Sequence, residues 1–143
     1  MPNPIVSKAS TTWNGTLFEG SGSTNLDSSG AAAFDVAWSS RAESHQGRTN
    51  PEELLAASHA TCFSMALSNE LTNNGTPPTQ LQTSAEVTFV AGEGITGIAL
   101  SVRAQVPDIS AEDFQKIADG AKSGCPVSQA LQAVPITLDA SLA

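Results

Sequence analysis

The sequence has few basic residues and no long apolar run. Lysine and arginine together number six, against 14 aspartates and glutamates, and the formal net charge is −8. Nucleic acids and anionic membranes are bound by clustered basic side chains, so neither is an expected partner. The apolar stretches are too short and too broken to span a bilayer. The first residues lack the basic and apolar regions of a secretory signal, so we expect a cytoplasmic protein.

Cysteine is also scarce, because only Cys62 and Cys125 occur among the 143 residues. Two distant cysteines in a reducing compartment are typical of reactive or merely buried thiols rather than of a structural disulfide framework. The length suits one domain with a single sizeable core. No repeat, low-complexity tract or linker divides the chain, and we therefore expect a single domain over residues 1–143.

The segment around Cys62 predicts a long helix. Asn50 suits the N-cap, Pro51 suits the first helical position, and Glu53 stands where a capping box places its carboxylate. Residues 73–78 (NNGTPP) end the helix. Its apolar residues point in nearly every direction, and a helix that is apolar all round is buried all round. We therefore expect Cys62 to lie in a central buried helix.

The second cysteine precedes Pro126, a residue that commonly opens a helix. Cys125 is therefore expected to be an N-cap, where free N–H groups and the positive end of the helix dipole favour a thiolate. A thiol in the middle of a buried helix has a raised pKa unless a cation is brought to it. On the residues alone, Cys125 is thus the more acidic candidate, and Cys62 would need an arginine.

The part of the chain before the helix is expected to be β-structure. Asn14 and Gly15 predict a hairpin turn. Residues 20–30 are expected to form a flexible or bulged section, and residues 31–38 a strand. Residues 39–49 are expected to form a loop, which holds Arg41 and Arg48 next to the cysteine helix.

The part after the helix alternates apolar and polar residues over 81–90 and again over 98–106. This pattern predicts an antiparallel hairpin with one buried face. A helix from Ser110, a short helix over 126–132 and a strand over 136–142 follow. The order of β-structure, helix, two strands, helix and strand predicts an α+β fold.

Two motifs together resemble one family. Residues 50–67 (NPEELLAASHATCFSMAL) and 124–128 (GCPVS), at this separation, are similar to the OsmC family (osmotically inducible protein C). These proteins are hydroperoxide reductases related to the organic hydroperoxide resistance proteins. The resemblance extends over nearly the whole chain in element order and length. It implies an OsmC-like fold, with antiparallel sheets wrapped around a central cysteine-bearing helix, and an intertwined homodimer with sites at the interface.

The resemblance also implies an activity, a peroxidase that reduces organic hydroperoxides in oxidative and osmotic stress defence. In such chemistry a thiolate attacks the O–O bond, forms a sulfenic acid and is resolved by a second thiol. The resemblance assigns the attack to Cys62 and the resolution to Cys125, through a disulfide between them. It implies no metal and no organic cofactor. The reductant is a dithiol, and the family points to lipoylated proteins.

Two further residues match the family's motif. Arg41 matches the cation that holds the Cys62 thiolate, with Arg48 as a rival, and Glu52 matches the partner that orients this arginine. The chain has no arginine before Arg41, which favours the OsmC branch over the organic hydroperoxide resistance branch. Ten helical residues, a rise of about 15 Å, separate Glu52 from Cys62. Two antiparallel helices in a dimer would bring one chain's Arg41 and Glu52 towards the other chain's Cys62.

His59 lies one turn before Cys62 and suggests other functions for this chain. The first is a cysteine hydrolase that uses a Cys–His pair. A zinc site is another, although four ligands would need every cysteine and histidine of the chain, or carboxylates. A third is a stress-induced binding protein on the same fold, whose pocket holds a small apolar ligand and whose cysteines are idle. We expect His59 to be a packed residue at the dimer seam, and Phe63, Met65 and Trp38 to belong to a pocket or core.

Overall fold

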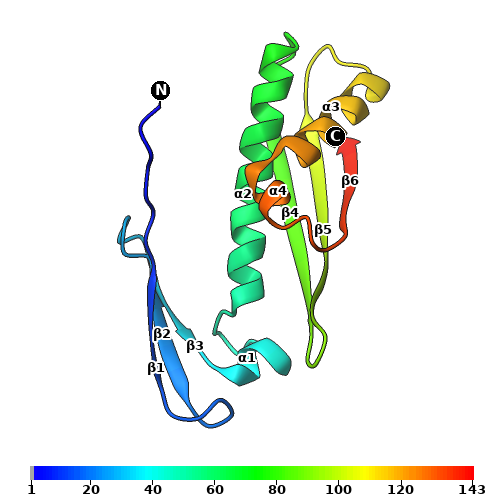
Figure 1. The fold of residues 1–143 in the computed structure, drawn as a ribbon. Helices are drawn as coiled ribbons and strands as arrows, with labels where there is room; N and C mark the ends of the chain where they lie inside the picture. The colour runs from blue at the N-terminus through cyan, green and yellow to red at the C-terminus, as the bar shows by residue number, and fades with distance from the viewer. Residues whose placement is uncertain (1) are drawn as a thin grey trace. The chain divides into compact units, whose positions relative to one another are not determined.

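The computed structural model describes residues 2–143, which form two compact units. The first unit ends at Pro51, and the second unit covers Glu52–Ala143. Each contains a three-stranded sheet, and helices occur in both, so the expected α+β class is confirmed (Figure 1). The expectation that residues 1–143 form one domain stays a prediction.

The first unit contains the strands β1 (Ser10–Asn14), β2 (Ser21–Asn25) and β3 (Ala33–Val36), which pair antiparallel in this order. The predicted hairpin is present, but residues 15–20 connect its strands in place of a tight turn. The flexible section expected from residue 20 is wrong in its first half, which is β2. A Cβ at Gly22 would lie 2.7 Å from the Thr12 carbonyl oxygen and 2.9 Å from the Trp13 ring, so this glycine serves the close packing of the strand.

A short helix, α1 (Trp38–Ala42), stands where the sequence predicted a loop. The buried Ser40 hydroxyl lies 2.7 Å from the Ala37 carbonyl oxygen and 2.8 Å from that of Thr49, and the Asn50 side chain donates to the Ser40 carbonyl at 2.7 Å. Side-chain bonds therefore hold this helix, which is too short for a periodic pattern to reveal. Arg41 lies in the last turn of α1 rather than in a loop.

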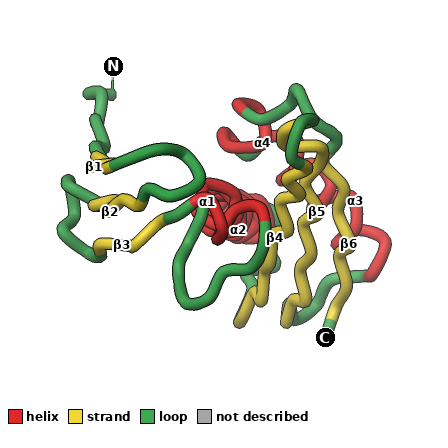
Figure 2. Tube along the Cα trace, turned by 90° about the horizontal axis from the view of Figure 1, so that it is seen from below, coloured by secondary structure: helices red, strands yellow, loops and turns green. Residues whose placement is uncertain are grey.

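The second unit contains the strands β4 (Gln80–Val90), β5 (Gly94–Gln105) and β6 (Ile136–Leu142), with β5 in the middle (Figure 2). The predicted antiparallel hairpin of β4 and β5 is confirmed. The strands β5 and β6 are parallel, so the expectation of purely antiparallel sheets is wrong for this pair. Residues 106–135 hold two helices and return the chain to the same end of the sheet, as a parallel pair requires.

The long helix is α2 (Pro51–Asn73), which begins at the predicted proline. Gly75, with φ 82°, donates its N–H to the Thr72 carbonyl at 3.0 Å, and the Thr76 N–H donates to the Leu71 carbonyl at 3.0 Å. These two bonds form the Schellman motif that ends a helix at a left-handed glycine. The predicted stop is therefore confirmed.

The burial of α2 differs from the expectation. Figure 1 shows α2 running along β4, and the stripe His59, Phe63, Leu67 and Leu71 is completely buried. On another side of α2, the Met65 side chain is 70% exposed. Burial all round is therefore wrong for the single chain, because sheet and helices of the second unit cover only one side of α2.

The core lies between α2, the sheet of the second unit and α3 (Ala111–Gly124), which is followed by α4 (Pro126–Ala130). Every buried hydrophobic side chain among residues 2–143 belongs to this unit: Phe63, Leu67, Leu71, Ile98, Leu100, Val102, Ala104, Phe114, Ala118, Ala121 and Cys125. The core thus surrounds the two cysteine-bearing segments. Among residues 2–143, no helix has the length and apolar character needed to cross a membrane.

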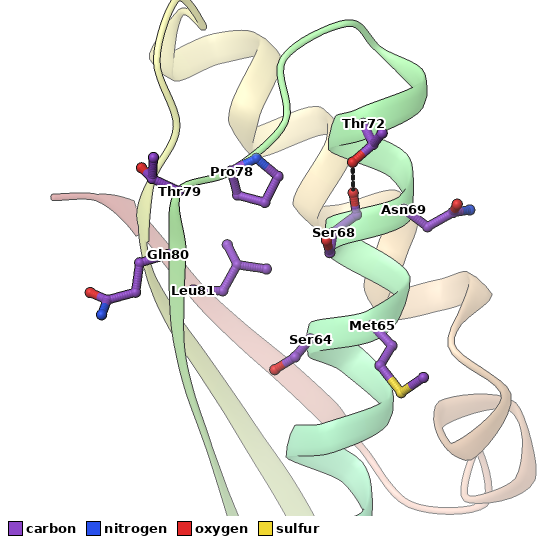
Figure 3. A pocket seen from close by; sticks show the side chains of 9 residues that line it. All are labelled: Ser64, Met65, Ser68, Asn69, Thr72, Pro78, Thr79, Gln80 and Leu81. Carbon is purple, nitrogen blue, oxygen red and sulfur yellow. Dashed lines mark hydrogen bonds between the residues drawn. The ribbon is translucent and has the colours of Figure 1, made fainter.

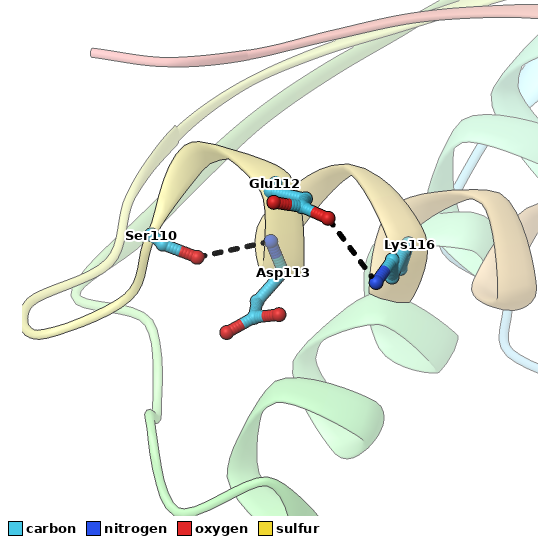
Figure 4. Close-up of polar contacts among 4 residues, drawn as sticks. All are labelled: Ser110, Glu112, Asp113 and Lys116. Atoms are coloured by element: carbon cyan, nitrogen blue, oxygen red, sulfur yellow. Dashed lines mark hydrogen bonds and ion pairs between the residues drawn. The ribbon is translucent and has the colours of Figure 1, made fainter.

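The predicted start of α3 at Ser110 is confirmed. The Ser110 hydroxyl oxygen accepts a hydrogen bond from the Asp113 N–H at 3.1 Å (Figure 4). Glu112 and Lys116 form an ion pair at 3.4 Å one turn apart, and both side chains are largely exposed. The cap therefore contributes more to the stability of α3 than the ion pair does.

Replacing Ser110 by alanine should lower the free energy of unfolding by about 1 kcal/mol, because the Asp113 N–H loses its acceptor. Ser110→Asp should retain most of the stability, since aspartate also caps. Lys116→Ala, which removes only the exposed pair, should cost less than about 0.5 kcal/mol. Urea unfolding followed by circular dichroism measures all three. Equal midpoints for Ser110→Ala and the unmodified protein would contradict the assigned cap.

Candidate active site

The two cysteines lie at different depths in the second unit. Cys62, on α2 next to the buried Phe63, is partly buried and packs against the core. Cys125 has no exposed surface and joins α3 to α4. Its N–H donates to the Ala121 carbonyl at 2.9 Å, so it ends one helix and begins the next. Both are free thiols.

The fold brings these two thiols together, because the crossover that carries Cys125 packs against α2. The Cys62 and Cys125 side chains are hydrogen-bonded to each other. Two thiols that are hydrogen-bonded to each other are neighbours, which is the first requirement for a disulfide between them. The pairing predicted for the two cysteines therefore has the proximity that it needs.

Cys125 is the more acidic of the two thiols. Burial by itself raises its pKa, but hydrogen bonds from the Cys62 thiol, from the N–H and hydroxyl of Ser128 and from the Val127 N–H together lower the pKa below the usual range. The predicted N-cap position is confirmed, with Pro126 in the first turn of α4. The Cys125 side chain makes no capping hydrogen bond to α4 as a neutral thiol. The neighbouring donors lower its pKa because they stabilise the ionised form.

Cys62 has the opposite tendency. Burial raises the pKa of Cys62, and the hydrogen bond and charge of Cys125 raise it further, against a smaller lowering by the Val127 N–H. This order agrees with the expectation from the residues alone. A Cys62 thiolate therefore needs a cation beyond the groups that act on it within the second unit.

His59 is fully buried within the single chain, so it is not simply a residue of a dimer seam. Its Nε2 lies 2.7 Å from the Ser128 Oγ. Its Nδ1 is buried and has no hydrogen-bond partner among residues 2–143. Burial lowers the pKa of His59, which keeps the ring neutral. The ring is bonded to Ser128 rather than to Cys62, which gives no support to a Cys–His hydrolase.

Ser128 is a residue that the sequence alone does not single out. It lies three residues after the N-cap Cys125, at the position whose side chain turns back to the cap in a capping box. That spacing is the local signal that could have identified it. Its contact with His59, 69 positions away in the chain, has no such signal.

The charged residues of the predicted site belong to different units, because the division of the chain falls between Pro51 and Glu52. Arg41 and Arg48 belong to the first unit, and their role at the thiols stays a prediction. Glu52 is buried in the first turn of α2. It precedes Cys62 by ten residues on one continuous helix, about 15 Å along the axis, so it does not reach its own thiol. No group of three or more His, Cys, Asp or Glu side chains within residues 2–143 is arranged to hold a metal ion.

An open groove of about 620 Å³ lies between α2 and the start of β4 (Figure 3). Met65 and Leu81 supply its apolar side chains, and Ser64, Ser68 and Gln80 supply polar ones. The expectation that Met65 lines a pocket is thereby confirmed. Neither cysteine lines this groove, so the thiol pair is a separate site.

The fold and the site define a class, a small α+β protein with two free thiols paired beside a long helix that is buried on one side. The family model for OsmC-like protein matches residues 44–139. Peroxiredoxin OsmC of Escherichia coli is 43% identical over 141 residues, covering 96% of this chain and 97% of that protein. The chain belongs to the OsmC-like protein family.

Solved structures agree with this assignment. The organic hydroperoxide resistance protein OhrB of Bacillus subtilis has a TM-score of 0.65 and 25% identity, over 95% of this chain and 98% of that one. An OsmC protein of Legionella pneumophila has a TM-score of 0.71 and 21% identity, over 99% of both chains. The predicted OsmC-like fold is therefore confirmed.

Oxidation should close a Cys62–Cys125 disulfide in the folded protein. Because residues 62–125 then form a closed loop, the free energy of unfolding should rise by up to about 4 kcal/mol. Urea unfolding of the oxidised and reduced forms measures the difference. The same oxidant should leave the stability of Cys125→Ser unchanged. Equal midpoints for the two redox forms, or disulfides between chains only, would contradict the observed proximity.

Proposed function

We propose that this protein is a thiol-dependent peroxidase that reduces organic hydroperoxides to alcohols. The observation that carries the proposal is the contact between a partly exposed thiol, Cys62, and a buried thiol, Cys125. A peroxidatic and a resolving cysteine must meet in this way. Relatives named peroxiredoxin and organic hydroperoxide resistance protein support the same chemistry.

The proposed reaction has two steps. The Cys62 thiolate attacks the O–O bond, takes one oxygen with its hydrogen as a sulfenic acid, and releases an alkoxide that gains a proton to become the alcohol. The Cys125 thiolate then attacks the Cys62 sulfur, so that an S–S bond forms, the S–O bond breaks and hydroxide leaves as water. Two thiols are oxidised and one hydroperoxide is reduced. A dithiol, for which we propose a lipoylated protein, restores both thiols by exchange.

Accessibility supports this division of roles although the pKa order opposes it. Cys62 is partly exposed, whereas Cys125 has no exposed surface that a hydroperoxide could reach. Attack therefore falls to Cys62, whose raised pKa must be offset by a cation. We propose that Arg41 is this cation and that it also polarises the peroxide. The buried carboxylate of Glu52 orients it.

A homodimer would complete this site. Glu52 lies too far along α2 to serve its own Cys62, so the chain needs a second copy to bring the two together. Large apolar side chains remain exposed in both units, among them Ile5 at 88%, Phe18 at 76% and Met65 at 70%. We propose that an intertwined dimer covers such side chains, that residues 1–143 act in it as one domain, and that it works in the cytoplasm.

The first test is the intact mass of fully reduced protein after one equivalent of an organic hydroperoxide. Formation of the disulfide should remove two hydrogens, a loss of about 2 Da that a dithiol reverses. Cys125→Ser should instead gain one oxygen, as a sulfenic acid at Cys62. An unchanged mass with both thiols still titratable after unfolding would refute the peroxidase and favour a ligand-binding protein with idle cysteines.

The shared site can be tested with mixed dimers. Arg41→Met and Cys62→Ser should each reduce peroxidase turnover by about 100-fold or more, because each removes a group that the first step requires. A dimer with one chain of each kind should regain one working site, since its unmodified Cys62 meets the partner's unmodified Arg41. Turnover after mixing and reassociation of the two variants measures this recovery.

Arg48→Met is the matched control, because it removes a second arginine of the same unit. It should keep turnover close to that of the unmodified protein. A large loss in Arg48→Met with none in Arg41→Met would exchange their roles. No recovery in mixed dimers, or an active monomer in sedimentation, would rule out the shared site.

A further inference from the structure

The proposed mechanism leaves one buried polar pair unused, His59 and Ser128. Their Nε2 and Oγ atoms lie 2.7 Å apart, and the two side chains are 0% and 5% exposed. His59 lies on α2 one turn before Cys62, and Ser128 lies on α4 three residues after Cys125. The pair therefore links the two elements that carry the thiols.

The direction of the hydrogen bonds follows from counting protons. The Ser128 hydroxyl is one of the donors that lower the pKa of Cys125, and a thiolate can only accept, so when Cys125 is ionised the single hydroxyl proton points to the sulfur. Ser128 Oγ must then accept from His59, which places the ring proton on Nε2. The Nδ1 atom remains a bare acceptor, and it is indeed the buried atom without a partner in residues 2–143. An unpaired acceptor is tolerated better than an unpaired N–H donor.

We propose that the His59–Ser128 pair is a positioning element for the resolving step. His59 holds the Ser128 hydroxyl so that it donates to the Cys125 thiolate while this sulfur attacks the sulfenic acid of Cys62. This inference rests on the proposed peroxidase function. It assigns to His59 and Ser128 a part in disulfide closure and none in the reduction of the peroxide.

The geometry explains why such a pair serves the second step. The Cys125 sulfur must remain ionised without solvent and must lie in line with the S–O bond that breaks. The imidazole donates to the hydroxyl and the hydroxyl donates to the sulfur. This chain of hydrogen bonds stabilises the negative charge of the thiolate in a buried site. The 2.7 Å bond also ties α2 to α4, the two elements at which the thiols lie. The hydroxide that leaves Cys62 takes up one proton from solvent to become water, which replaces the proton that Cys125 released when it ionised, and no further reactant is needed.

Rapid-mixing experiments on the full-length protein separate the two steps. After addition of an organic hydroperoxide, quenching with a sulfenic acid trap measures the Cys62 sulfenic acid, and mass spectrometry measures the disulfide. In Ser128→Ala the sulfenic acid should form at the unmodified rate, whereas disulfide closure should slow by about three- to tenfold. The trapped sulfenic acid should therefore accumulate.

The histidine offers a graded series. His59→Leu should slow closure as well, because the Ser128 hydroxyl loses its donor. His59→Gln keeps an N–H donor near the position of Nε2 and should recover most of the rate. Ser123→Ala is the matched control, because it removes an exposed hydroxyl two residues from Cys125 that bonds only the Asp119 carbonyl. It should change neither step.

A second readout needs no peroxide. The onset of thiolate absorbance in the reduced protein should move to higher pH in Ser128→Ala, since the thiolate loses a donor. If Ser128 served packing alone, neither this onset nor the ratio of the rates of sulfenic acid formation and disulfide closure would change. Ser128→Ala would then slow both steps equally or lower only the stability of the protein.

The outcomes distinguish this inference from the function on which it rests. Disulfide closure in Ser128→Ala at the unmodified rate, or equal losses in His59→Gln and His59→Leu, would overturn the inference and leave the peroxidase intact. Absence of both sulfenic acid and disulfide in the unmodified protein would overturn the proposed function and the inference with it.

Discussion

The packing of one stripe of α2 on the sheet of the second unit governs the rest of this structure. His59, Phe63, Leu67 and Leu71 recur at four-residue spacing and are completely buried, so the helix has a single allowed rotation about its axis. That rotation places Cys62 at the margin of the core, where it is covered on one side only. A thiol at such a margin can meet both a buried partner and a substrate from outside.

The acidity of the two thiols follows from what surrounds each sulfur rather than from its depth. Cys125 is the deeper thiol, yet its pKa is lowered, because N–H groups and a hydroxyl converge on it at the start of α4. Cys62 is more exposed, yet its pKa is raised, because burial and a neighbouring sulfur act on it without such donors. The donors that lower the pKa of Cys125 therefore all belong to the second unit. The groups of the same unit leave the pKa of Cys62 raised.

Local signals predicted well wherever the neighbouring residues decide the structure. The ends of the helices could be predicted: Pro51 and Gly75 mark the two ends of α2, Ser110 caps α3 and Cys125 is the N-cap of α4. Each of these helix ends is determined by residues within one turn of it. The alternation in β4 and β5 was readable because one face of their sheet is buried.

The features that escaped prediction depend on partners far along the chain. The five-residue helix α1 is held by bonds from Ser40 to residues about ten positions on, and β2 reads as a flexible segment because its glycine makes room for Trp13. The parallel pairing of β6 follows from a crossover rather than from its own alternation. In the site, both cysteines could be named from their motifs. The bond between His59 and Ser128 joins residues 69 positions apart, and no sequence pattern near either residue indicates it.

The parallel strand pair has a consequence for the newly made chain. Cys125 lies inside the crossover between β5 and β6, so it can meet Cys62 only after the chain has passed through β4, β5 and α3. Contacts between distant parts of a chain form late in folding. A chain still in synthesis thus carries Cys62 on a finished helix with no second thiol beside it. A thiol–disulfide exchange assay would therefore report when the crossover has brought the two cysteines together.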